Sequence, residues 1–130
     1  LRIKGIMLNL LFNILSHINA ANQTEKNILG KSILYINNNF TKKITIPFLS
    51  ELEGITPNYY TNLFMKNFKI SPVDYITLKR MEFSKALIKD KSLKLKEIAR
   101  MTGYPDEYYF SKVFKKYENM PPRKYRKLII

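Results

Sequence analysis

The stretch that decides the fold is Glu97–Tyr117, which reads EIARMTGYPDEYYFSKVFKKY. In its second half, apolar residues recur at i, i+3, i+4 and i+7, the spacing of one buried helical face. These residues are Phe110, Val113, Phe114 and Tyr117. Gly103 can adopt a positive φ and end a preceding helix abruptly, and Asp106 suits the N-cap of the next helix. The pattern predicts two helices joined by a tight turn, which fits a helix-turn-helix unit or an ordinary α-hairpin.

The two predicted helices differ in what they offer to solvent. The first is short, with apolar positions at Leu95, Ile98, Ala99 and Met101. The second carries polar or cationic side chains opposite its apolar face, namely Tyr108, Ser111, Lys112 and Lys115. A second helix with a polar outer face is the form that a DNA-reading helix-turn-helix unit takes.

Charge is distributed unevenly along the 130 residues. The formal net charge is +13, and residues 79–130 carry 15 Lys and Arg against 6 Asp and Glu, which is +9 of that total. Such a balance favours a polyanionic partner, with nucleic acid first and an anionic membrane surface second. A lysine-rich surface that is simply solvated is the alternative.

Composition also limits the classes of function. The chain has no cysteine, which excludes disulfides and thiolate sites, and its one histidine is His17. We find no glycine-rich phosphate loop, zinc-ligand spacing or nucleophile–base pair, so we expect neither an enzyme, a bound metal nor a cofactor. No apolar run is long enough to span a membrane, so we expect no membrane insertion.

Two segments of the chain resemble each other at an offset of 50 residues. Phe64–Tyr75 reads FMKNFKISPVDY, and Phe114–Tyr125 reads FKKYENMPPRKY. Upstream, ITIPFLSELEG aligns with the helix that precedes Gly103 after a slip of one residue in the turn, where length changes are tolerated. The hairpin therefore has a twin, in which Thr56 is the expected N-cap and Pro57 the first helical residue.

A long helix is predicted between the twins. Pro72–Lys89 has a helical apolar pattern without internal proline or glycine, formed by Val73, Ile76, Met81, Phe83, Ala86 and Leu87. A helix of about 18 residues spans roughly 27 Å. As a rigid connector it would hold two recognition helices for entry into successive major grooves, about 34 Å apart on one face of DNA.

At this point the residues resemble the AraC/XylS family of bacterial transcription regulators, over about residues 24–128. The resemblance is carried by a glycine–aromatic pair, an Asp N-cap, an aromatic-Phe-Ser run, Phe-Lys-Lys and Pro-x-x-Tyr-Arg. In this chain these are Gly103, Tyr104, Asp106, Tyr109, Phe110, Ser111, Phe114, Lys115, Lys116, Pro122, Tyr125 and Arg126. In the first unit, Met65 stands at the usual lysine and Lys69 at the usual glycine, so we expect a differently ended helix there.

The resemblance implies an all-α fold of about seven helices, with the first near residues 24–39 and the last near 121–128. Residues 24–130 would form a double helix-turn-helix domain with a long connector helix. Members of the family are cytoplasmic, sequence-specific DNA-binding transcription regulators, often activators. They contact promoter DNA and RNA polymerase, and no cofactor is implied.

Residues 1–23 are predicted to form a linker helix. Their apolar residues cover more than one face, which indicates more than one packing partner. Because many family members carry an N-terminal sensor domain, we interpret this segment as the link to such a domain, missing from this chain. Full packing on residues 24–130 is the alternative.

The resemblance places base contacts on the outer faces of the two recognition helices. They are Asn58, Thr61 and Asn62 in the first, and Glu107, Tyr108, Ser111 and Lys112 in the second. Asn pairs with adenine and a Thr methyl packs on thymine, which favours A·T-containing sites. The Glu107 carboxylate can accept from cytosine or instead act on the dipole of its helix.

Five cations are candidates for phosphate contacts, with plain solvation as the alternative: Lys66, Lys115, Lys116, Arg123 and Lys124. Tyr109 is predicted to lie in the core, and Arg80 to be a structural residue of the connector. A second function stays open, in which a basic helical module docks on an anionic membrane surface or an acidic protein. Membrane binding would need large apolar side chains on the outer faces, where only Tyr108 and Met65 stand.

Overall fold

The computed structural model describes residues 23–129, and it is helical wherever it is regular. The seven helices of this part are α2 (Gln23–Asn39), α3 (Ile46–Glu53), α4 (Pro57–Phe68), α5 (Pro72–Ile88), α6 (Leu95–Met101), α7 (Glu107–Glu118) and α8 (Pro122–Ile129). The all-α prediction is confirmed. The linker helix predicted for residues 1–23 lies outside the described residues, except for Gln23, which begins α2.

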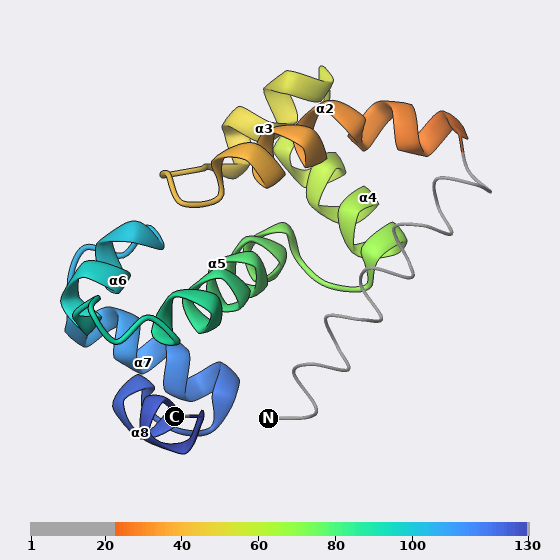
Figure 1. The fold of residues 1–130 in the computed structure, drawn as a ribbon. Helices are drawn as coiled ribbons and strands as arrows, with labels where there is room; N and C mark the ends of the chain where they lie inside the picture. The colour runs from red at the N-terminus through yellow and green to blue at the C-terminus, as the bar shows by residue number, and fades with distance from the viewer. Residues whose placement is uncertain (1–22, 130) are drawn as a thin grey trace.

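The helices form two lobes that share α5 (Figure 1). Helices α2, α3 and α4 form the first lobe, and α6, α7 and α8 form the second, while α5 packs on α4 at one end and on α6 at the other. The predicted connector is therefore confirmed, with 17 residues. The Ser71 hydroxyl begins it by accepting from the Asp74 N–H at 3.0 Å.

The repeat is visible in how aromatic rings pack. In the first lobe, the rings of Phe64 and Tyr75 meet edge to face with centroids 5.6 Å apart. In the second, Phe114 and Tyr125 meet in the same way at 5.4 Å. Each pair joins a recognition helix to the helix that follows it, so the 50-residue offset in sequence corresponds to a repeated core.

The turn between the two helices of each unit is also repeated. The N–H of Ile55 bonds to the Ser50 carbonyl at 3.1 Å, and the N–H of Tyr104 bonds to the Ala99 carbonyl at 2.9 Å. These six-residue closures place Gly54 at φ 69° and Gly103 at φ 100°. Such a helix ending needs a positive φ at that position, which glycine adopts without strain.

The predicted helix starts are confirmed, and one predicted helix end is wrong. Thr56 accepts from the Tyr59 N–H at 3.2 Å, and Asp106 from the Tyr109 N–H at 2.8 Å. Lys69 was expected to change how α4 ends, yet it takes the left-handed conformation at φ 66°, as Asn119 does after α7. The Lys69 N–H still reaches the Met65 carbonyl at 2.9 Å, so lysine accepts the strained backbone without altering the turn.

Some residues predicted as apolar core are exposed. Met101 is 42% exposed and Val73 is 58% exposed, and Ala86 also faces solvent. Helix α6 has only seven residues, and Ile98 and Ala99 form its buried side. The helical spacing of apolar residues therefore predicts a wider buried face on α5 and α6 than the packed helices have.

We predict that the two turn glycines differ in their tolerance of alanine. A Cβ on Gly103 would lie 2.7 Å from the Thr41 carbonyl oxygen, whereas a Cβ on Gly54 meets nothing within 4 Å. Gly54→Ala should lower the free energy of unfolding by about 1 kcal/mol, through backbone strain alone. Gly103→Ala adds overpacking and should cost about 2–4 kcal/mol. Urea denaturation of both variants checks this, and equal losses would contradict the contact at Thr41.

Candidate nucleic-acid interface

Helix α4 presents a polar face on the first lobe. Its inner side is held by Tyr60, Leu63, Phe64 and Phe68, all of which are buried. On the opposite side, Asn58 and Asn62 are exposed, Thr61 is half-buried and Met65 is 45% exposed. The structure therefore brings the three predicted base contacts of this unit onto one outer face, which we call the first reading face (Asn58, Thr61, Asn62).

Helix α7 presents the corresponding face on the second lobe. Tyr108 is 74% exposed, Lys112 is exposed, and Glu107 and Ser111 are half-buried. The Lys112 ammonium lies over the Tyr108 ring, with Nζ 5.4 Å from its centroid. This cation–π contact holds the lysine along the outer surface of the helix. We call these four residues the second reading face (Glu107, Tyr108, Ser111, Lys112).

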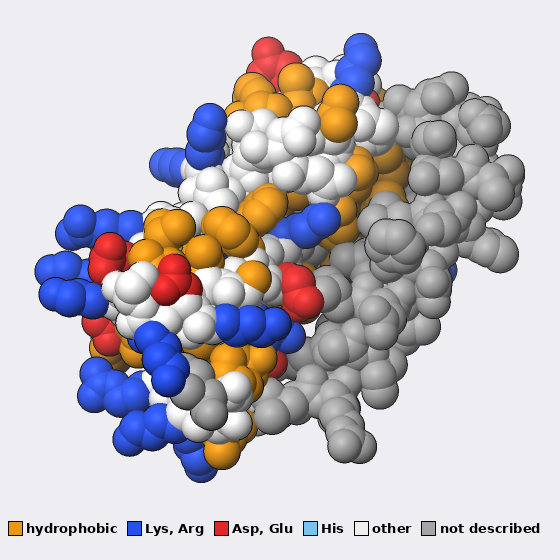
Figure 2. Space-filling model, in the orientation of Figure 1, with side chains coloured by type: hydrophobic (Ala, Val, Ile, Leu, Met, Phe, Trp, Pro, Cys, Tyr) orange, Lys and Arg blue, Asp and Glu red, His pale blue; other side chains and the backbone are white. Residues whose placement is uncertain are grey.

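The predicted phosphate contacts are all exposed, and the basic charge gathers on the second lobe. Lys66 lies in the last turn of α4, and Lys115 and Lys116 lie in the last turn of α7. Arg123 and Lys124 lie at the start of α8. Figure 2 shows lysine and arginine side chains concentrated over the region of α6 to α8. Contact with phosphate itself stays a prediction for all five.

Five further cations, to which the sequence pattern assigns no role, are also exposed. They lie on α6 and the segment leading to it, namely Lys89, Lys91, Lys94, Lys96 and Arg100. In helix-turn-helix proteins, the first helix of the unit crosses the DNA backbone. Their density within 12 residues was the available signal for a second group of phosphate candidates.

Of two predictions about side chains near the interface, the one for Tyr109 is wrong and the one for Arg80 is confirmed. Tyr109 was expected in the core, but it is 50% exposed and rests edge-on against Tyr104, with centroids 5.6 Å apart. Tyr109 lies in the first turn of α7, and this turn precedes the buried residues of the helix, which begin at Phe110. Arg80 was expected to be structural, and this is confirmed: its Nε donates to the Phe40 carbonyl at 2.6 Å and its Nη2 to the Lys42 carbonyl at 2.9 Å.

Polar contacts fix α7 against α5. The Tyr117 hydroxyl donates to Oδ1 of Asp74 at 3.1 Å. The Nζ atom of Lys85 lies 3.6 Å from Oε2 of Glu118, a residue that is only 2% exposed. Burial raises the pKa of Glu118, and Lys85 opposes this shift. Burial lowers the pKa of Lys85, but Glu118 and Glu82 outweigh it, so that the net shift is upward. Burial and Asp74 raise the pKa of Tyr117 to about 12, so this phenol keeps its proton at neutral pH.

Within residues 23–129 no three His, Cys, Asp or Glu side chains are grouped as metal ligands would be. None of the helices placed in the structure has the length and apolarity to cross a membrane.

Two helix-turn-helix units, repeated in sequence and in packing around one shared helix, define the class of this protein. The family described as "Helix-turn-helix domain" matches residues 49–128. The chain belongs to this family, and its resemblance to the AraC/XylS type is thereby confirmed.

Individual proteins show the same likeness. The C-terminal domain of the response regulator yesN from Fusobacterium nucleatum superposes with a TM-score of 0.69 at 38% identity, over 73% of this chain and 93% of that one. The HTH-type transcriptional activator Btr of Bacillus subtilis is 39% identical over 85 residues, which is 65% of this chain and 16% of Btr. The lactose operon transcription activator of Staphylococcus xylosus is 35% identical over 92 residues, 71% of this chain and 33% of that protein. The chain thus spans a third or less of the length of these two relatives.

Proposed function

We propose that this chain is the DNA-binding part of a bacterial transcription regulator. Its two reading faces bind successive major grooves of promoter DNA and recognise a specific sequence. The observation that carries the proposal is the repeated recognition helix, buried by aromatic side chains on one face and polar on the other. The net charge of the chain, +13, supplies the attraction to a polyanion.

The named relatives support the finer parts of the proposal. Btr and the lactose operon regulator are both called activators, so activation is the proposed sign of regulation. Activation gives RNA polymerase as the expected protein partner. A sensor or dimerisation domain, linked to this one through residues 1–23, and a cytoplasmic location complete the proposal.

Base recognition follows from side-chain chemistry. The amides of Asn58 and Asn62 suit the paired donor and acceptor of adenine, and the Thr61 methyl suits thymine. On the second face, Lys112 suits the acceptors of guanine and Glu107 the amino group of cytosine, while Ser111 can contact any base. The phosphate candidates on α7 and α8 would set the register of the protein on the duplex without adding sequence information.

The membrane-binding alternative is not favoured by the exposed faces. The large exposed side chains with apolar area on α4 and α7 are three tyrosines and one methionine, flanked by amide, hydroxyl and charged groups: Tyr59, Met65, Tyr108 and Tyr109. An interfacial helix needs a continuous apolar face to enter the lipid.

We expect duplex DNA binding to weaken steeply with salt. If roughly six phosphates are neutralised, log K should fall against log [salt] with a slope near −5. Fluorescence anisotropy with a labelled duplex between low and physiological salt measures this slope, with anionic vesicles titrated in parallel. A slope shallower than about −2 would argue against a footprint over two grooves.

We expect Asn62→Ala and Lys112→Ala to weaken specific binding more than non-specific binding. Each removes one side chain of a reading face, and a good base contact is worth about 1–3 kcal/mol. Asn38→Ala and Lys31→Ala are matched controls, because both residues are exposed on α2. Affinities for a selected duplex and for a scrambled duplex decide the matter. Equal losses on both would reassign Asn62 and Lys112 to phosphate contacts.

We expect one chain to protect one asymmetric site of about 16–20 base pairs. The two helix-turn-helix units, which we call heads, would lie one helical turn of DNA apart and so cover nearly two turns. Bending the DNA to fit both heads would cost a few kcal/mol. Ile76→Pro should break α5 and uncouple the heads, with circular dichroism as the control for folding. Hydroxyl-radical footprinting supplies the test. A palindromic footprint that needs two chains would contradict the two-headed monomer and leave DNA binding intact.

A further inference from the structure

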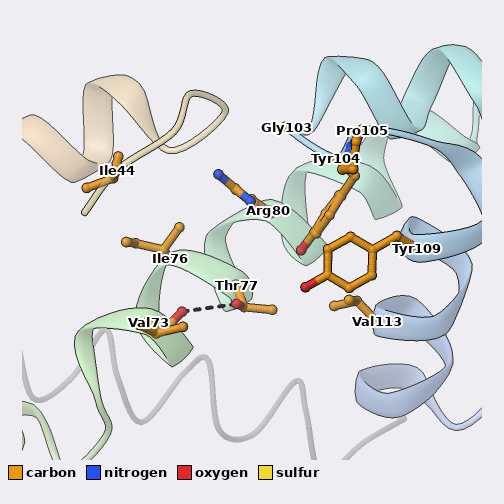
Figure 3. A pocket seen from close by; sticks show the side chains of 10 residues that line it. All are labelled: Ile44, Val73, Ile76, Thr77, Arg80, Gly103, Tyr104, Pro105, Tyr109 and Val113. Carbon is orange, nitrogen blue, oxygen red and sulfur yellow. Dashed lines mark hydrogen bonds between the residues drawn. The ribbon is translucent and has the colours of Figure 1, made fainter. Parts of the chain in front are cut away.

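Arg80 lies at the seam between the two lobes. From the middle of α5 it holds two carbonyls of the loop that follows α2, those of Phe40 and Lys42. Its guanidinium carbon also lies 5.2 Å from the centroid of the Tyr104 ring, in the turn before α7. One side chain therefore contacts the first lobe and the second lobe together. Figure 3 shows it between the loop that carries Ile44 and the turn of Gly103 and Tyr104.

The contact continues from Arg80 to the second recognition helix. The Tyr104 ring meets the Tyr109 ring at 89°, and Tyr109 belongs to the first turn of α7. Gly103 lies directly against Arg80 and the loop after α2, because a Cβ on Gly103 would be 3.0 Å from Arg80 Cζ and 2.7 Å from the Thr41 carbonyl oxygen. A short series of contacts thus runs from the loop after α2, through Arg80, to the start of the second reading face.

Within the described residues, the lobes are also joined through the shared helix α5, to which α7 is held by the Tyr117–Asp74 hydrogen bond and the Lys85–Glu118 ion pair. The main helix pairs join α2 to α3, α3 to α4 and α4 to α5, and then α5 to α6, α6 to α7 and α7 to α8. Beside Arg80, a cavity of about 210 Å³ separates Ile44 and Val73 from Tyr109 and Val113. Because these larger helix contacts all lie within one lobe or run through α5, a side chain that touches both lobes directly can fix the angle between them.

We propose that Arg80 is a positioning residue that fixes the relative placement of the two reading faces, and so the number of base pairs allowed between the two half-sites. The part of this proposal that concerns half-site spacing rests on the proposed function, because it requires DNA binding. Its structural part, the relative placement of α4 and α7, is independent of DNA.

Arg126 provides a matched control. Its guanidinium also binds backbone carbonyls, with Nε 3.0 Å from the Ile88 oxygen and Nη2 2.9 Å from the Leu93 oxygen. Ile88 is the last residue of α5, Leu93 lies in the segment before α6, and α8 carries the arginine, so the contact does not join α2, α3 or α4 to the second lobe. Both arginines hold chain segments in place, and only Arg80 does so across the seam.

The first measurement needs no DNA. The chain has no cysteine, so Asn62→Cys and Lys112→Cys together give two spin-label positions, one on each reading face. Double electron–electron resonance then reports the distance between the faces. We expect a narrow distribution in the parent and in the Arg126→Ala variant. In the Arg80→Ala variant we expect a broadened or shifted distribution.

The second measurement uses the cysteine-free chain with a duplex selected from a random pool by that chain, and derivatives with two base pairs inserted or removed between the half-sites. Two base pairs rotate one half-site by about 70° and shift it by roughly 7 Å. Rigid heads should then lose at least about tenfold in affinity, since one face loses its base contacts. Arg80→Ala should reduce this penalty to about threefold or less and Arg126→Ala should leave it unchanged.

Circular dichroism and urea denaturation check that each variant folds. If Arg80→Ala does not fold, Arg80→Lys replaces it, since lysine keeps the charge but cannot hold two carbonyls in a fixed fork. Distances and spacing penalties equal to those of the parent would overturn the proposal. A broadened distance with an unchanged spacing penalty would also overturn it, because the spacing would then be set elsewhere. If no duplex is selected, the proposed function fails and the distance measurement alone decides the role of Arg80.

Discussion

The structure depends on the burial of an aromatic stripe along each recognition helix. Phe64 and Phe114 are fully buried, and each meets a tyrosine of the helix that follows. Burying such rings removes large apolar areas from water and fixes the rotation of the helix about its axis. That rotation determines which side chains face outward. The polar reading faces are thus a consequence of where the phenylalanines lie.

The same constraint explains how much of the fold the sequence predicts. Stripes of period 3.6, N-cap residues and turn glycines are local features, and the helices and their boundaries follow from them. The exposed sides of α4 and α7 follow as well, because a helix with one buried stripe has a defined opposite side. Asn58, Asn62, Tyr108 and Lys112 are therefore found on the surface as predicted.

What sequence patterns miss depends on contacts between distant residues or on small energies. Tyr109 and Val73 are apolar at helical spacing, but whether a neighbour covers them depends on the angle between the lobes. The left-handed conformation of Lys69 was not anticipated, because lysine is modestly strained there and the closing hydrogen bond to Met65 offsets that strain. The partners of Arg80 lie 38 and 40 residues away, and no local pattern indicates them.

Helix α5 completes the first unit in the way that α8 completes the second, with Tyr75 and Tyr125 in equivalent places. It also supplies the surface on which α6 packs. The two units are therefore not independent domains joined by a flexible linker. A cut on one side of α5 leaves the first unit without its last helix, and a cut on the other side leaves the second unit without the helix on which α6 packs. A protease that opens α5 would therefore remove the link between the two units and, at the same time, part of the surface on which each of them packs.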